Sequence, residues 1–154
     1  MNKKRKWSFR LTLLIVLILG FSLAGCVTHP PRSFYRRDLV GVWHGSYFAN
    51  QGETGLTLTV WEENGNYRAI FHFYHLPGRT DTWIMPAGME GRYYMNVTVP
   101  HRGFFKLVGT EWIHRPGDNW IFADLQGELF GDIFQGAVLG VGGDFRFVVF
   151  RQRD

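Results

Sequence analysis

The chain of 154 residues contains a single cysteine, Cys26, and only two serines follow it, Ser33 and Ser46. One cysteine cannot form a disulfide within the chain, so a folded domain must be stabilised by its core alone. Ser46 lies in "HGSYF", which lacks the Gly-x-Ser-x-Gly of a nucleophile elbow. Serine-based nucleophilic catalysis is therefore not expected.

A positive cluster and an apolar run precede the cysteine. Five basic residues lie within residues 1–10, and residues 11–24 are mostly apolar. This arrangement is typical of a signal peptide. The run falls short of the roughly 20 apolar residues that a transmembrane helix needs, and Thr12, Gly20 and Ser22 interrupt it. We therefore expect export rather than a permanent membrane-spanning helix.

The apolar run ends in Leu23, Ala24, Gly25 and Cys26. These four residues resemble the lipobox of bacterial lipoproteins, which has the form Leu, small, small, Cys. The resemblance covers residues 1–26 and implies a diacylglyceryl group on the Cys26 thiol, cleavage just before it and acylation of the new amino terminus. Because each buried methylene contributes about 0.8 kcal/mol, such chains would hold the protein on a membrane. A thiol modified in this way is also excluded as a nucleophile.

The residues after the cysteine bear on location. In Gram-negative lipoproteins an aspartate at the next position tends to retain the protein in the inner membrane, whereas Val27 and Thr28 follow here. The resemblance thus implies the cell envelope, and the periplasmic face of the outer membrane if the source is Gram-negative. Residues 26–38 contain two prolines and no apolar period, which predicts a tether between the lipid and a domain at residues 39–154.

The overall basicity of the chain belongs to its first 25 residues, which hold five of the 17 Lys and Arg and none of the 13 Asp and Glu. The remainder has 12 basic and 13 acidic residues, a net charge of −1. A nucleic-acid partner is therefore not expected.

Residues 39–154 show the pattern of an all-β domain, with short apolar runs bounded by Gly, Pro, Asn and Asp. The strongest local signal is Asn64-Gly65 between two segments of period two, which predicts a hairpin. The predicted strands are residues 39–48, 54–63, 67–75, 91–99, 104–113, 119–126, 128–139 with a break, and 145–151.

About eight antiparallel strands expose two edges unless the sheet closes, so we expect a single antiparallel β-barrel. Gly41-Val42-Trp43 in the first strand, with Arg146 and Arg151 in the last, resembles the calycin barrels (lipocalins and avidin-like proteins). That resemblance implies that Trp43 packs at one end of the barrel under Arg151 or Arg146.

The interior of such a barrel is either filled by side chains or holds one small ligand. After residue 25 the chain has twelve Phe, five Trp and six Tyr, enough large rings to fill it. A cavity lined by Trp, Tyr and a few polar groups is the alternative. Both remain open until the register is known.

Neither a metal site nor an enzymatic site is expected, and no cofactor is implied. His72 and His75 are three residues apart on one strand, which places them on opposite faces. The carboxylates are scattered without a recognisable spacing, and the adjacent Glu62 and Glu63 also point to opposite faces.

Two longer loops are the candidates for binding. Residues 76–88 carry Arg79, Asp81 and Trp83, and residues 114–120 carry Trp120. Exposed aromatic residues on loops are common anchors for ligands and partners. Two functions follow: a barrel that binds a small apolar or amphipathic ligand, or a filled barrel that docks to another envelope protein or to glycan.

Overall fold

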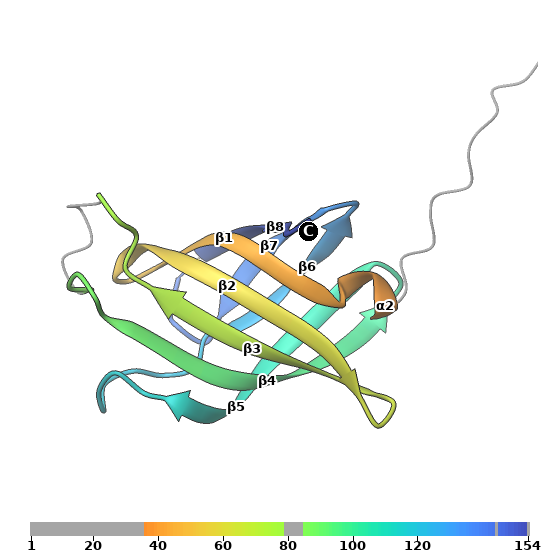
Figure 1. Ribbon diagram of the computed structural model, residues 1–154, viewed down its shortest axis with the longest axis horizontal. Coiled ribbons are helices and arrows are strands. Elements are labelled where there is room, and N and C mark those ends of the chain that lie inside the picture. The colour runs from red at the N-terminus through yellow and green to blue at the C-terminus, as the bar shows by residue number, and fades with distance from the viewer. Residues whose placement is uncertain (1–35, 79–84, 144, 154) are drawn as a thin grey trace, which may run out of the picture. The chain divides into compact units, whose positions relative to one another are not determined.

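The computed structural model describes residues 36–78, 85–143 and 145–153, which all belong to one compact unit. Eight antiparallel strands form a closed barrel in which each strand pairs with its neighbours in sequence and β1 pairs with β8 (Figure 1). The elements are α2 (Arg36–Leu39), β1 (Gly41–Ala49), β2 (Gly52–Glu63), β3 (Asn66–Tyr74), β4 (Glu90–His101), β5 (Phe104–His114), β6 (Asp124–Phe130), β7 (Ile133–Leu139) and β8 (Phe145–Arg151). The predicted all-β barrel is confirmed. In the described ranges, no helix has the length and apolar character needed to cross a bilayer.

The predicted hairpin of β2 and β3 is confirmed. Asn64 and Gly65 both have positive φ, 53° and 77°, as a tight two-residue hairpin turn requires. Glu63 pairs with Asn66, and the ladder continues to Gly55 and Tyr74. Because side chains alternate across a strand, this register sends the period-two residues of both strands into the barrel.

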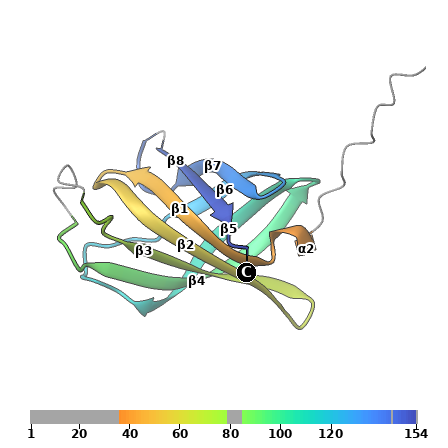
Figure 2. The ribbon, with the colours of Figure 1, turned by 45° about the horizontal axis from the view of Figure 1, so that its top comes forward.

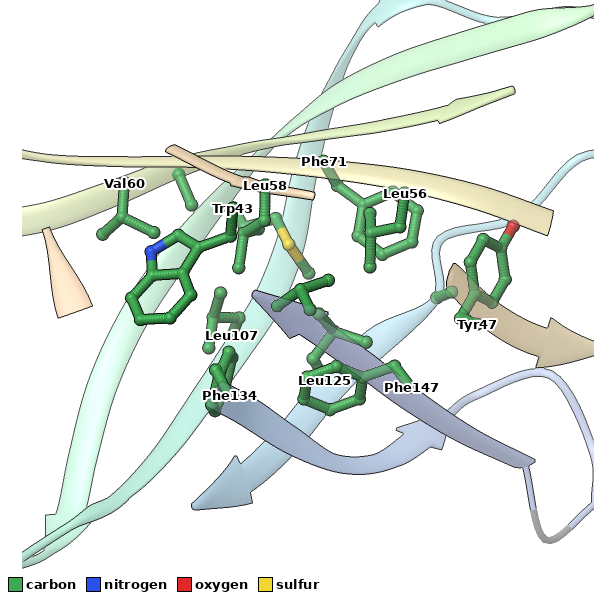
Figure 3. Close-up of a cluster of buried hydrophobic side chains, with 14 of the residues drawn as sticks. Trp43, Tyr47, Leu56, Leu58, Val60, Phe71, Leu107, Leu125, Phe134 and Phe147 are labelled. Carbon is green, nitrogen blue, oxygen red and sulfur yellow. The ribbon is translucent and has the colours of Figure 1, made fainter. Parts of the chain in front are cut away.

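The inward side chains fill most of the barrel, as Figure 3 shows for ten labelled residues. Trp43 lies at one end of this cluster and Tyr47 at the other. Phe134 contacts Trp43, Phe105 and Phe147 with ring centroids 4.8–6.5 Å apart, so aromatic edges and faces close the middle of the barrel. The interior near Trp43 is therefore a packed core.

Three inward positions are glycine because the strands approach closely there. A Cβ atom at Gly45 would lie 2.0 Å from the Val148 carbonyl oxygen, and one at Gly136 would lie 2.1 Å from that of Gln126. Gly127 faces Gly136 across the β6–β7 ladder under the same restriction. The closed, tightly bent sheet thus requires residues without a side chain at these positions.

The predicted strand at residues 119–126 is wrong over residues 119–123. Strand β6 begins only at Asp124, and its ladder with β5 has four pairs, from Phe104 with Glu128 to Leu107 with Leu125. Beyond them the Asp124 carboxylate accepts a hydrogen bond from the Gly109 amide at 2.9 Å in place of a ladder bond. Residues 115–123 instead form a connection, in which Trp120 stacks on Phe73 and Phe122 on Trp112. The break expected within residues 128–139 falls at Gly131 and Asp132, between β6 and β7.

The two ends of the barrel differ. The helix end carries α2 and the short turns β2–β3, β4–β5 and β6–β7. The loop end carries the β1–β2 and β7–β8 turns and the longer β3–β4 and β5–β6 connections. Both views show these groups at opposite ends (Figures 1 and 2).

Candidate binding site at the loop end

A hollow of about 230 Å³ lies at the loop end, and we call it the cup. Among the described residues, its walls come from the adjoining ends of β1, β3 and β4 and from the β1–β2, β5–β6 and β7–β8 connections. It is lined by the aromatic residues Tyr47, Phe73, Tyr93 and Trp120, by the amides Asn50, Gln51 and Asn119, and by Ile121, Ala123 and Val141. The barrel is thus filled on the side of the helix end and hollow at its loop end.

Two buried tyrosines lie where the packed core meets the cup. The Tyr93 hydroxyl donates to the Ala123 carbonyl oxygen at 2.7 Å and accepts from the Ala123 amide at 3.1 Å. Gln51 Nε2 donates to the Tyr47 hydroxyl at 2.8 Å. Burial raises the pKa of both tyrosines well above its usual value, although these hydrogen bonds partly oppose the shift. Both phenols are therefore neutral at physiological pH.

The β5–β6 connection contributes one aromatic side of the cup, Trp120. Trp120 stacks on Phe73 with ring centroids 5.0 Å apart and an interplanar angle of 27°. Phe122 stacks on Trp112 at 5.0 Å, and its ring lies close to the α-carbon of Gly109. Arg115 donates from Nε and Nη2 to the Trp120 carbonyl oxygen at 3.0 and 2.7 Å. Trp120 is therefore held by its backbone as well as by ring stacking.

The rim of the cup is polar and uncharged. Asn50 Nδ2 donates to the Val141 carbonyl oxygen at 2.9 Å, which ties the β1–β2 turn to the β7–β8 turn. The amides of Asn50, Gln51 and Asn119 offer both donors and acceptors. No Asp, Glu, Lys, Arg or His is among the described residues that line the cup. Its chemistry suits a neutral molecule, because an ion would leave water for a site without a counter-charge.

Of the predicted ligand-binding residues, Trp120 lies in the cup, whereas Arg79, Asp81 and Trp83 lie outside the described residues. The described ends of their loop are at the loop end of the barrel. His75 Nδ1 donates to the Met85 carbonyl oxygen at 2.8 Å, and the Met85 side chain is fully buried.

Of the two arginines proposed to cover Trp43, Arg151 does so. Its guanidinium carbon lies 4.2 Å from the centre of the Trp43 ring, which is fully buried. Arg146 is exposed on the outer wall, where it lines a shallow hollow with Phe104, Phe130 and other residues of β5–β8. It takes no part in the contact at the helix end.

His72 and His75 lie in different surroundings, since His72 is in β3 whereas His75 follows its last residue, Tyr74. His72 Nε2 is 3.0 Å from Glu90 on the outer wall, and this hydrogen bond lowers the pKa of Glu90, whereas His75 serves the β3–β4 loop. Across the described ranges, no three His, Cys, Asp or Glu side chains lie close enough to hold a metal ion.

The sequence did not single out Tyr47, Tyr93 or the amides of the cup. Tyr47 follows Trp43 by four residues and therefore points to the same inward face of β1. The alternation of side chains along the strand could thus have identified it. Asn50 and Gln51 read as ordinary turn residues, and only the closed topology brings them beside Trp120.

Cys26 lies outside the described residues. No protein-family model, curated protein or solved structure matches the chain.

Proposed function

We propose that this protein is a lipid-anchored protein of the bacterial cell envelope, on the periplasmic face of the outer membrane if the source is Gram-negative. Its barrel binds a small, uncharged, amphipathic molecule in the cup. The carrying observation is the composition of the cup: four aromatic side chains and three amides, with no charged group among the described lining residues. Apolar walls with a few convergent polar groups are the usual form of small-molecule sites.

The size of the cup narrows the ligand. Its volume of about 230 Å³ is below the range of about 300–1,000 Å³ that is common for ligand pockets. The cup therefore holds a small molecule whole, or one end of a longer amphipathic molecule. The amides at the rim bind its hydroxyl, carbonyl or amide groups, while Trp120 and Phe73 cover its apolar part.

The proposal also includes a lipid anchor at Cys26 and a binding function without catalysis. The anchor is supported by the resemblance of Leu23 to Cys26 to the lipobox. A binding role without catalysis is supported by the chemistry of the cup, whose described ionisable groups are two phenols with raised pKa values. Neither phenol is suited to proton transfer near neutral pH.

An adaptor role is the second candidate. Most of the interior is filled, and Ile121 at the edge of the cup is 58% exposed. An exposed apolar residue beside Trp120 suits the docking of another envelope protein or of glycan. In that case the rim would bind a partner and the cup would stay without cargo.

Native mass spectrometry of the full processed chain, extracted in mild detergent from its own cells, tests the proposal. A defined extra mass that is lost on denaturation supports a ligand, and its composition identifies the class. A variant Ala123→Leu, which fills the cup, is expected to lose that mass, because Ala123 lines the hollow and is buried.

The matched control is Trp61→Ala, since Trp61 contacts Tyr94 on the outer wall, away from the cup. This control is expected to keep the bound mass. A bare chain, with no melting shift across neutral lipids, haem and glycans, would reject the ligand function and favour the adaptor.

A further inference from the structure

Three exposed apolar side chains form a patch on the outer wall at the helix end. Phe130 and Phe150 are each 51% exposed and Ile133 is 36% exposed. They lie on three adjacent strands, since Phe130 pairs with Ile133 across β6–β7 and Ile133 pairs with Phe150 across β7–β8. Register therefore places them side by side as one surface, which we call the apolar patch.

The chain enters the barrel at this same end, and its point of entry is held in place. Trp43 Nε1 donates to the Leu39 carbonyl oxygen at 2.9 Å. Arg151 donates to the Val40 carbonyl oxygen at 2.7 Å and also to that of Asp38. The Trp43 bond attaches the end of α2 to β1, and the Arg151 bonds attach it to β8, the strand that carries Phe150.

The distance from the anchor to this end is short. Residues 27–35 are the nine residues between Cys26 and the start of α2. Cys26 and Arg36 are therefore ten residue steps apart, and a fully extended chain spans at most about 35 Å between them. A lipid on Cys26 would thus keep the helix end within about that distance of the bilayer surface.

The charged residues beside the apolar patch favour a lipid bilayer as its partner over an apolar groove of another protein. Asp132, in the β6–β7 turn, forms ion pairs with Arg151 at 3.3 Å and with Arg153, so two guanidinium groups meet one carboxylate. These arginines lower the pKa of Asp132, which stays ionised, so these three side chains together carry a net charge of +1. Arg153 is 78% exposed, and a guanidinium group in that position can bind lipid phosphates.

We infer that the helix end rests on the bilayer, with Phe130, Ile133 and Phe150 in contact with the lipid surface and Arg153 among the headgroups. The cup at the loop end then faces away from the membrane, toward ligands in the aqueous compartment. This inference rests on the lipid anchor of the proposed function and is independent of the ligand.

The single cysteine makes a direct test feasible. If Cys26 is acylated, an introduced cysteine is the only free thiol in the chain. Phe150→Cys and Phe48→Cys each replace an exposed phenylalanine, 51% and 49% exposed, at the helix end and near the loop end respectively. Each acylated variant is labelled with a bimane fluorophore and reconstituted into phosphatidylethanolamine and phosphatidylglycerol vesicles that contain lipids with brominated acyl chains.

Bromolipids are expected to quench the fluorophore at position 150 and to leave the one at position 48 unquenched. Equal quenching at both positions, quenching at 48 alone, or none at either would overturn the inference. Protection of position 150 by self-association, seen as a dimer mass in detergent, would also overturn it and assign the patch to a second copy. The intact mass of the purified chain separates this failure from failure of the anchor, because a chain without acyl groups rejects both.

Discussion

The guanidinium group of Arg151 stacks on the indole of Trp43, with 4.2 Å between the guanidinium carbon and the ring centre. The contact joins the last strand to the first, and the same arginine binds the carbonyl oxygens that precede β1. One side chain thus links barrel closure to the start of the folded domain.

Replacing this arginine should destabilise the barrel. Arg151→Ala removes the cation–π contact and leaves the Val40 and Asp38 carbonyl oxygens without this donor. We expect the free energy of unfolding to fall by about 2–4 kcal/mol. Urea denaturation measures it, with the exposed Arg146→Ala as a control that should change it by less than about 0.5 kcal/mol. Equal losses in the two variants would contradict the role of Arg151.

The barrel should lose stability at high pH. Burial raises the pKa of Tyr47 and Tyr93 in the folded state, whereas in the unfolded chain both titrate near pH 10. Above pH 10 the unfolded chain releases protons that the folded chain keeps, so the unfolded state is favoured. The free energy of unfolding should then fall by up to about 1.4 kcal/mol per pH unit for each tyrosine.

Urea denaturation between pH 8 and pH 11 checks this dependence. Tyr47→Phe and Tyr93→Phe should each flatten the slope above pH 10, although Tyr93→Phe should also lower stability at pH 8 because it loses both bonds to Ala123. A slope that neither variant changes would mean that other groups govern the loss.

The glycines at which two strands approach closely should not tolerate replacement by alanine. In Gly45→Ala the new Cβ atom would overlap the Val148 carbonyl oxygen, at 2.0 Å, and β1 and β8 would have to separate. We expect a loss of about 3 kcal/mol or more. Gly117→Ala is the control, since the nearest atom to its Cβ would be 3.7 Å away, in ordinary contact. Thermal unfolding of both variants measures the difference, and similar melting temperatures would contradict the steric argument.

Lipidation depends on one atom, the Cys26 sulfur. Cys26→Ser should yield an unprocessed precursor with no incorporated fatty acid, because a serine hydroxyl does not replace the thiol in this modification. Metabolic labelling with a radioactive fatty acid, together with the intact mass, measures both effects. A Cys26→Ser variant that is still cleaved and labelled would reject the anchor.

Loop variants distinguish the two candidate functions. Trp120→Ala removes one wall of the cup and should lower ligand occupancy in native mass spectra. If the protein is an adaptor, Trp83→Ala, and with it Arg79→Ala and Asp81→Ala, should instead reduce capture of the envelope partner, with no ligand bound in any variant. Occupancy that survives Trp120→Ala would place the ligand elsewhere.

The sequence alone determined the class of fold and its best hairpin. Every second residue of β2 and β3 is apolar on either side of Asn64-Gly65, and this period of two with a two-residue turn was enough to predict the hairpin. The closed barrel also followed from the number of strands and the need to avoid edges.

The tertiary structure decided what local pattern left ambiguous. Strand β8 reads Phe-Arg-Phe-Val-Val-Phe-Arg, with apolar residues on both faces, so only its pairing with β1 shows that Arg151 meets Trp43 and that Arg146 points outward. The start of β6 was misplaced: Trp120, which the sequence placed in a strand, lies in the β5–β6 connection and stacks on Phe73, 47 residues earlier. The cup was likewise beyond the sequence, since its walls come from separate connections that lie together only once the barrel closes.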